Sequence, residues 1–337
     1  MQTTIFTENK QKQAQNEQKQ AKNKQKPIKI TLNSIENVEK LFLRYLAIKR
    51  SCGVVDKTLK TYLSHFSACS RYFNTQKSID KLTENDMQNM VLSLRAQGLS
   101  PNTIRSYTVT LRVFFTWCRQ EGYTPPPLAK YKGEDIIKET YTDDELKILL
   151  KKPNLRTAHF PEYRTWVIIN LLVNSGCRAS TIRNIQIRDL DLPNNIIHAR
   201  HTKNKKALVI PLCSEMVAII REYLSIRGGE AEDYLFCNQY GEELSENALK
   251  NSIEHYNKRR GLQKTSTHLF RHTFARKYLI DCGGDAFTLQ KLLGHSTLDM
   301  TRHYCEIFNA DIAKNYDRVS PLAQLNAKNK KLKMTKK

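Results

Sequence analysis

Three consecutive prolines, Pro125 to Pro127, separate two parts of this 337-residue chain that have different hydrophobic patterns. Proline lacks a backbone N–H and fixes φ, so a helix that reaches PPPLAKYKGED must end and continue as an extended connection. A length above 300 residues also favours two domains, because single domains usually have about 100 to 200 residues. The sequence therefore predicts a linker at 125–140, between an N-terminal domain at 31–124 and a second domain at 141–326.

The part before the prolines has apolar residues at helical spacing. This spacing predicts four amphipathic helices, at 34–51, 56–74, 84–97 and 101–121. Ser100 followed by Pro101 favours a helix start, because serine caps helices well and proline is tolerated at the first helical position. Two of the helices, TLKTYLSHFSACSRYF and TIRSYTVTLRVFFTW, share the start Thr-x-x-x-Tyr. We expect an all-helical N-terminal domain.

The part after the prolines changes from helical spacing to alternation and back. IRNIQIRDLDLPNNIIHARHTKNKKALVIPL alternates and is interrupted by turn residues, which predicts short antiparallel strands. Helices are predicted on both sides of this stretch, at 142–151, 161–175, 213–226, 245–260, 268–281, 286–293 and from about 297. The predicted fold class is mainly α with a small antiparallel β-sheet.

The chain is strongly basic, with 55 Lys and Arg against 33 Asp and Glu and a net charge of +22. Such an excess favours a polyanionic partner, with DNA or RNA as the leading candidate. Residues 1–30 contain seven lysines and two glutamates, net +5, and the tail at 327–337 contains six lysines and no acid, net +6. The Gln/Lys-rich segment 1–30 is expected to be disordered, as a solubilising tail or a DNA-binding arm.

Other features argue for a soluble protein of the cytoplasm, associated with the nucleoid. The eight cysteines form no C-x-x-C pair, and no secretory apolar segment follows the polar start MQTTIFTENK. The longest apolar run, TWVIINLLV, is too short to cross a bilayer and is interrupted by Asn170. We expect reduced thiols, a buried helix at this run and no membrane partner.

Four histidines, three arginines and two tyrosines lie between residues 268 and 304. On a helix, His268, Arg271 and His272 share one sector. A zinc site is one interpretation, because His268 and His272 have a common ligand spacing and His295 offers a third ligand. Arg271 opposes it, since a guanidinium repels a dication. A phosphate site fits better, because arginine donates to two phosphate oxygens and histidine exchanges protons near neutral pH.

These residues resemble the C-terminal signature of the tyrosine recombinases, the phage-integrase-type site-specific recombinases. The matching pieces are THLFRHTFA (267–275), LLGH (292–295) and Tyr304, together with LLVNSGCRAST (171–181) and HTKNKKALVIPL (201–212). Residues 100–123 are similar to the family's SAM-like core-binding domain, so the resemblance covers about 35–320. It implies a catalytic set of Arg178, Lys203, His268, Arg271, His295 and Tyr304.

The resemblance also implies a role for each group in breaking a DNA phosphodiester. Arg178 and Arg271 would hold the two non-bridging oxygens and His295 would hydrogen-bond one of them. Tyr304 would attack phosphorus to form a 3′-phosphotyrosine, with His268 as its base and Lys203 as the acid for the leaving 5′-oxygen. No metal, cofactor or ATP is expected. Two positions depart from the family pattern, Thr181 in place of an acid and Leu208 in place of an arginine.

The expected function is that of an integrase or transposase that moves a mobile element. The expected partners are double-stranded DNA held in a C-shaped clamp, further copies of the chain in a tetramer assembled on DNA from free monomers, and DNA-bending accessory proteins. An amphipathic segment at 309–325 is expected to dock either on a neighbouring protomer or on its own domain. Alternatives are a non-cleaving DNA-binding regulator of the same fold and a type IB topoisomerase-like enzyme.

Overall fold

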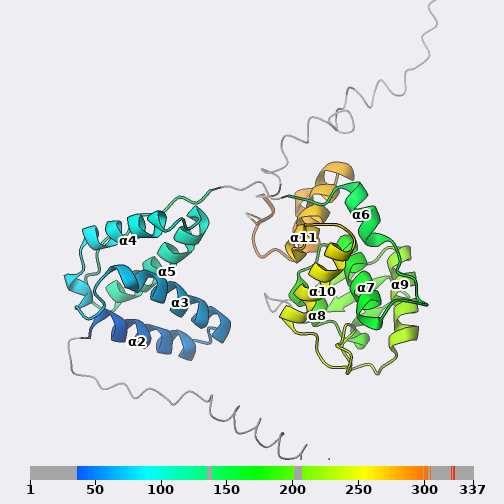
Figure 1. The fold of residues 1–337 in the computed structure, drawn as a ribbon, viewed down its shortest axis with the longest axis horizontal. Coiled ribbons are helices and arrows are strands. Elements are labelled where there is room, and N and C mark those ends of the chain that lie inside the picture. The colour runs from blue at the N-terminus through cyan, green and yellow to red at the C-terminus, as the bar shows by residue number, and fades with distance from the viewer. Residues whose placement is uncertain are drawn as a thin grey trace, which may run out of the picture. The chain divides into compact units, whose positions relative to one another are not determined.

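A computed structural model describes residues 36–134, 139–200, 207–298, 300–302, 304, 320 and 322. The chain divides between Asp135 and Ile136 into two compact units, called here the N-terminal and C-terminal units (Figure 1). Both are predominantly helical and the second holds a small antiparallel sheet, which confirms the predicted fold class. The predicted tails at 1–30 and 327–337, Lys203, and the segment 309–325 apart from residues 320 and 322 lie outside the described residues.

The N-terminal unit contains the four helices that the hydrophobic spacing predicts. They are α2 (Val38–Ser51), α3 (Asp56–Cys69), α4 (Glu84–Ala96) and α5 (Pro101–Gln120). The Ser100 hydroxyl accepts from the Thr103 N–H at 3.2 Å, and Pro101 occupies the first turn of α5. Helix α2 begins at Val38, later than predicted, because Asn37 caps it by accepting from the Lys40 N–H.

Aromatic rings from three helices form the core of the N-terminal unit. Phe42 of α2 stacks on Phe66 of α3 with ring centroids 3.9 Å apart, and Phe114 of α5 meets Phe42 edge-on at 5.0 Å. The two helices that share the Thr-x-x-x-Tyr start, α3 and α5, pack directly on each other. Their apolar stripes are therefore core, and their other faces form a joint outer surface.

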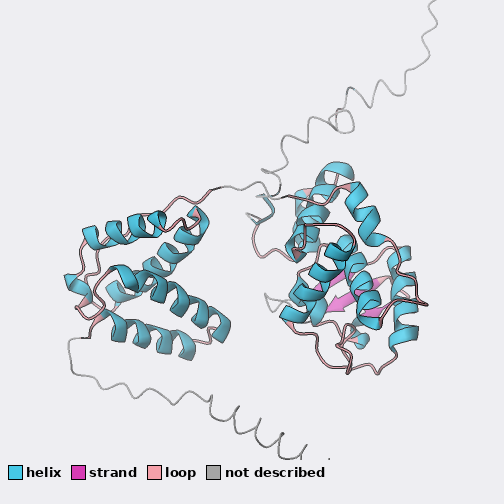
Figure 2. Ribbon diagram, in the orientation of Figure 1, coloured by secondary structure: helices cyan, strands magenta, loops and turns pink. Residues whose placement is uncertain are grey.

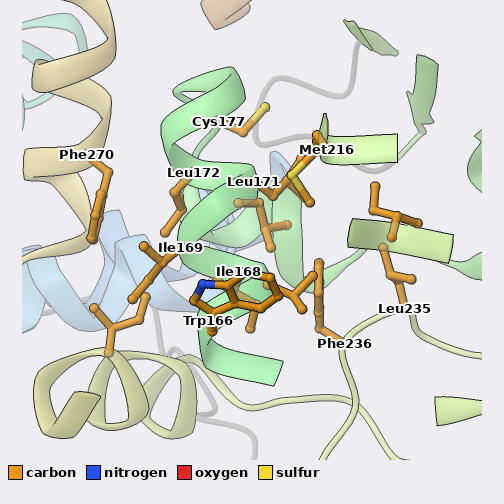
Figure 3. Close-up of a cluster of buried hydrophobic side chains, with 14 of the residues drawn as sticks. Trp166, Ile168, Ile169, Leu171, Leu172, Cys177, Met216, Leu235, Phe236 and Phe270 are labelled. Atoms are coloured by element: carbon orange, nitrogen blue, oxygen red, sulfur yellow. The ribbon is translucent and has the colours of Figure 1, made fainter. Parts of the chain in front are cut away.

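The C-terminal unit is organised around α7 (Phe160–Ser175), which is apolar on almost every side. Helices α6 (Asp143–Leu150), α9 (Ser214–Arg227), α10 (Glu246–Arg259) and α11 (Thr267–Arg276) pack against it. Figure 3 shows Trp166, Ile168 and Leu171 of this helix meeting Met216, Leu235 and Phe236 in the core. The run TWVIINLLV is thus a buried helix, as its composition predicts.

The sheet follows α7 and consists of β1 (Leu190–Asp191), β2 (Ile196–Ala199) and β3 (Leu208–Pro211), in that order and antiparallel (Figure 2). Ile197 pairs with Ile210, and both side chains are buried, whereas the next pair, His198 and Val209, faces outward. This alternation is the period-2 pattern seen in the sequence. Residues 201–206, which include Lys203, fall between β2 and β3 in the sequence and lie outside the described residues.

Two local features of the C-terminal unit differ from the prediction. The helix predicted at 268–281 is α11 followed by a π-helix, η4 (Lys277–Asp281), in which Lys277 pairs with Asp281 at 3.1 Å and also with Asp143. A short helix, α8 (Ala179–Arg183), has no counterpart in the prediction. Helix α12 (Ala286–Leu293) ends at Gly294 in the left-handed conformation, as predicted. None of the described helices is long and apolar enough to cross a membrane.

Candidate active site

Arg271 lies in the middle of α11 and is only 5% exposed. Its guanidinium donates to the carbonyl of Gly176 at 3.1 Å and to that of Leu293 at 3.0 Å. These carbonyls stand at the C-terminal ends of α7 and α12, where the helix dipole is negative. Burial and the nearby charge of Arg178 lower the pKa of Arg271. The site thus holds a desolvated cation on carbonyl dipoles.

Arg178 occupies the N-cap position of α8, two residues after the left-handed Gly176 that ends α7. Its Nη1 donates to the carbonyl of Gly294 at 3.3 Å. The two guanidiniums therefore bond consecutive carbonyls, those of Leu293 and Gly294. In the family pattern an acid stands at the position of Thr181 and can orient the first arginine. In this chain the bond to the Gly294 carbonyl orients the guanidinium of Arg178.

His295 follows Gly294 directly and is buried. Its Nδ1 lies 2.8 Å from the hydroxyl of Thr301, in the helical residues 300–302. Burial, with the charges of Arg271 and Arg178, lowers the pKa of His295 to about 4. The imidazole is therefore neutral at pH 7, and of its two nitrogens it is Nδ1 that contacts Thr301.

Tyr304 is 6% exposed and contacts two imidazole rings. Its ring is nearly parallel to that of His295, with centroids 5.9 Å apart and an interplanar angle of 8°. The ring of His272 lies 5.3 Å away at 46°. Burial raises the pKa of Tyr304, whereas the charge of Arg271, its hydrogen bond to the phenol and the charge of Arg178 oppose that rise. The phenol thus belongs to the same cluster as both guanidiniums.

A pocket of about 540 Å³ opens beside this cluster. Arg178 and His295 line it together with Thr181, the start of β3, the end of α12 and Ser296. Leu208, the other departure from the family pattern, lies in this wall and contacts Gly294. The lining thus combines the guanidinium of Arg178 with the neutral imidazole of His295.

The contacts above join four of the six predicted residues, Arg178, Arg271, His295 and Tyr304. His268 lies one helical turn before Arg271 in α11, and its side chain is exposed. Lys203 lies outside the described residues. Within the described ranges, no group of three or more His, Cys, Asp or Glu could hold a metal ion. The two histidines that prompted the zinc interpretation therefore differ in setting, since His268 is exposed and His272 is buried against Tyr304.

Two residues of the site were not in the predicted set. His272 was considered only as a zinc ligand, and its position directly after Arg271 is the sequence feature that could have placed it in the site. Thr301 gave no signal, because its bond to His295 depends on how the chain turns after Gly294. Both contact a predicted catalytic residue, His272 the ring of Tyr304 and Thr301 the imidazole of His295.

Comparisons with known proteins identify the family of this chain. Residues 139–310 match the phage integrase family, and residues 40–122 match the phage integrase N-terminal SAM-like domain. The tyrosine recombinase XerC of Thermodesulfovibrio yellowstonii is 28% identical over 298 residues, 84% of this chain and 96% of that protein. The tyrosine recombinase XerD of Staphylococcus haemolyticus is 26% identical over 301 residues, 86% of this chain and 100% of that protein.

Solved structures show the same fold. The Tn1549 transposon integrase in complex with transposon right end DNA has a TM-score of 0.67 at 19% identity, covering 82% of this chain and 99% of that one. A lambda integrase tetramer bound to a Holliday junction has a TM-score of 0.65 at 19% identity, covering 80% and 77%. With more than half of its length matched to one family model and about half of the rest matched to the domain that precedes it, this chain belongs to the phage integrase family of tyrosine recombinases.

Proposed function

We propose that this protein is a site-specific DNA recombinase of a mobile element, which cuts and rejoins duplex DNA through a 3′-phosphotyrosine. The observation that carries the proposal is the gathering of Arg178, Arg271, His295 and Tyr304 in one cluster. A phenol held beside two guanidiniums suits attack on a phosphodiester, whose anionic oxygens otherwise repel a nucleophile.

The arginines would bind the two non-bridging oxygens of the scissile phosphate. Their bonds to carbonyls fix each guanidinium and do not neutralise it, so the full charge remains available as negative charge accumulates in the transition state. The neutral imidazole of His295 would donate from Nε2 to one of these oxygens. Its contact with Thr301 holds the ring for this purpose.

In the cleavage step, Tyr304 loses its phenolic proton to His268 and its oxygen forms a bond to phosphorus. The bond from phosphorus to the 5′-oxygen breaks, and that oxygen takes a proton from Lys203 and leaves as a 5′-hydroxyl. The phosphotyrosine ester conserves the bond energy. A 5′-hydroxyl from another strand therefore reverses the step, and strand exchange needs no ATP.

Charge favours the joint outer surface of α3 and α5 as the DNA-facing part of the N-terminal unit. The two helices contain Lys57, Lys60, Arg105, Arg112 and Arg119, and a single acid, Asp56. A structural relative forms a tetramer on a Holliday junction, which supports the proposal that free monomers of this chain assemble on DNA in the same number. The segment 309–325 is proposed to dock either on a neighbouring protomer or on its own domain, and DNA-bending proteins are proposed accessory partners.

The test is a duplex nicked beside the cleavage site, so that the released fragment diffuses away and covalent protein–DNA adduct accumulates. We expect adduct with the wild-type protein, none with Tyr304→Phe, and no effect of EDTA. Adduct formation by the phenylalanine variant would refute the assignment of the nucleophile. Binding without adduct in the wild type would favour the non-cleaving regulator, and relaxation of plasmids lacking any target site would favour the topoisomerase.

A second candidate is a Xer-type recombinase, which the names of the full-length relatives favour. The ends of the DNA segment that carries the gene distinguish the two. An enzyme of a mobile element is expected to join those ends into a circle in vitro. Failure to do so, with adduct still formed on other sites, would favour the Xer-type candidate.

A further inference from the structure

Tyr304, the proposed nucleophile, contacts the imidazole of His272, a residue outside the predicted catalytic set. His272 is 7% exposed, and its ring lies 5.3 Å from that of Tyr304, slightly closer than the ring of His295 at 5.9 Å. The interplanar angles are 46° for His272 and 8° for His295. Two rings with different inclinations restrict the rotation of the phenol more than one parallel ring does.

The position of His272 is itself fixed by the residues on either side of it in α11. Phe270 is fully buried and lies 4.5 Å, ring to ring, from Tyr141. The hydroxyl of Thr273 accepts from the Tyr141 N–H at 2.9 Å and donates to the Leu269 carbonyl at 2.8 Å. The segment that leads into α6 thus clamps α11 at the turn that carries His272.

Tyr304 needs such support because of where it lies in the chain. It stands ten residues after Gly294, and its ring closes a small apolar cluster with Ala275, Leu289 and Leu293. The hydrogen bond from Arg271 holds the phenol oxygen and does not determine the plane of the ring. In-line attack depends on that orientation, and displacement of a reacting atom by about 1 Å can cost on the order of 10²-fold in rate.

We propose that His272 is a positioning residue for the nucleophile, its ring holding the phenol of Tyr304 in the orientation for attack. It acts through Tyr304 and does not touch the phosphate. The inference rests on the proposed recombinase function. The positioning role requires an aromatic ring at residue 272 and does not require that the ring carry a proton.

The variants His272→Ala and His272→Phe separate these properties. On the nicked duplex at saturating DNA, we expect His272→Ala to lower the single-turnover cleavage rate by on the order of 10²-fold, with unchanged DNA affinity. His272→Phe keeps a ring and is expected to recover most of that loss. Wild-type cleavage by the alanine variant, or equal loss in both variants, would overturn the proposal.

A substrate with sulfur in place of the bridging 5′-oxygen tests the step at which His272 acts. A thiolate leaves without protonation, so this substrate is expected to rescue Lys203→Ala and to leave the defect of His272→Ala in place. Rescue of His272→Ala by the sulfur substrate would assign His272 to the leaving group and contradict the proposal.

Phe236→Leu is the matched control, because it disturbs a fully buried ring of the same unit that packs on Tyr223 and has no part in holding His272. We expect it to lower the melting temperature and to keep the cleavage rate of the folded protein. A loss of cleavage equal to that of His272→Ala at the same melting temperature would show that general loosening of the C-terminal unit is sufficient, against the proposal.

One readout is independent of DNA. Nitration of Tyr304 in the free full-length protein, followed by mass spectrometry of its peptide, is expected to be slow in the wild type and in His272→Phe and severalfold faster in His272→Ala. Equal nitration in all three would overturn the positioning role even if cleavage is observed. Absence of wild-type adduct with the expected nitration pattern would instead reject only the proposed function.

Discussion

At the residue scale, Arg271 is a buried guanidinium that, among the described residues, has no salt bridge to a carboxylate. Arg271 is desolvated, and an unpaired buried charge is costly. The carbonyls of Gly176 and Leu293 offset that cost through two hydrogen bonds at helix ends. A carboxylate would cancel the charge that the phosphate must meet, whereas carbonyl dipoles orient the cation and leave its charge in place.

Arg271→Lys tests this arrangement. An ammonium is a compact donor that cannot match the planar guanidinium at both carbonyls and a phosphate oxygen together. We expect the cleavage rate at saturating DNA to fall on the order of 10²-fold or more, measured as adduct on the nicked duplex. A lysine variant as fast as the wild type would show that charge alone is sufficient.

The low pKa of His295 predicts an acid-sensitive fold. Its folded pKa of about 4 lies below the ordinary value of 6.5, so the unfolded chain binds the proton more readily between these values. The stability due to the neutral imidazole is therefore complete above pH 6.5 and is lost as the pH falls toward 4. The loss is expected to be on the order of 3 kcal/mol.

Urea unfolding at pH 7 and at pH 4.5 measures this effect, with His295→Gln as the reference. Between pH 7 and pH 4.5, the unfolding free energy of the wild type is expected to fall by more than that of His295→Gln. Parallel pH dependences in the two proteins would contradict the low pKa. The variant keeps a hydrogen-bonding group near Thr301, which limits the change to the titration.

At the scale of elements, the site depends on how closely the end of α7 approaches α11 and α12. Gly176 has φ +59°, and a Cβ there would lie 2.6 Å from the Phe274 ring and 2.9 Å from the Leu293 side chain. The same glycine supplies one of the carbonyls that hold Arg271. The contact of these three helices thus sets both the packing and the place of the cation.

Gly176→Ala should therefore affect stability and catalysis together. We expect it to lower the unfolding free energy by about 2 to 4 kcal/mol, from the left-handed conformation and from overpacking. Gly98→Ala is the control, because φ there is +74° and a Cβ would meet nothing within 4 Å. Urea unfolding compares the two, and equal losses would show that the close approach at Gly176 carries no extra cost.

At the scale of the whole molecule, the basic excess predicts how the protein holds DNA. Phosphate contacts release counterions, so the affinity should fall steeply as salt rises. The outer surface of α3 and α5 supplies Arg105 and Arg112, and α4 supplies the exposed Arg95 elsewhere on the N-terminal unit.

Replacing Arg105 and Arg112 by alanine is expected to reduce the slope of log K against log salt by about one each. Binding of the full chain to a duplex, measured over a series of salt concentrations, gives this slope. Arg95→Ala should leave it unchanged. An equal reduction of the slope by all three substitutions would show that the DNA contacts extend beyond α3 and α5.

Much of the local structure follows from the sequence alone. The spacing of apolar residues predicted α2 to α7, the serine and proline before α5 predicted its start, and Gly294 predicted the end of α12. These features depend on neighbours within one or two turns. The helix α8 was missed because five residues are too few for a periodic pattern, and the π-helix after α11 shows no break in that pattern.

The order of Arg178, Arg271, His295 and Tyr304 in the sequence likewise resembles a family motif, and this motif alone predicted them as candidate catalytic residues. Only the tertiary structure decided what holds them. Arg271 bonds a carbonyl 95 residues away, and Arg178 bonds one 116 residues away. It also distinguished buried His272 from exposed His268, which share one helix. Spacing along a chain reports only on near neighbours, whereas these contacts arise when the ends of α7 and α12 pack against the middle of α11.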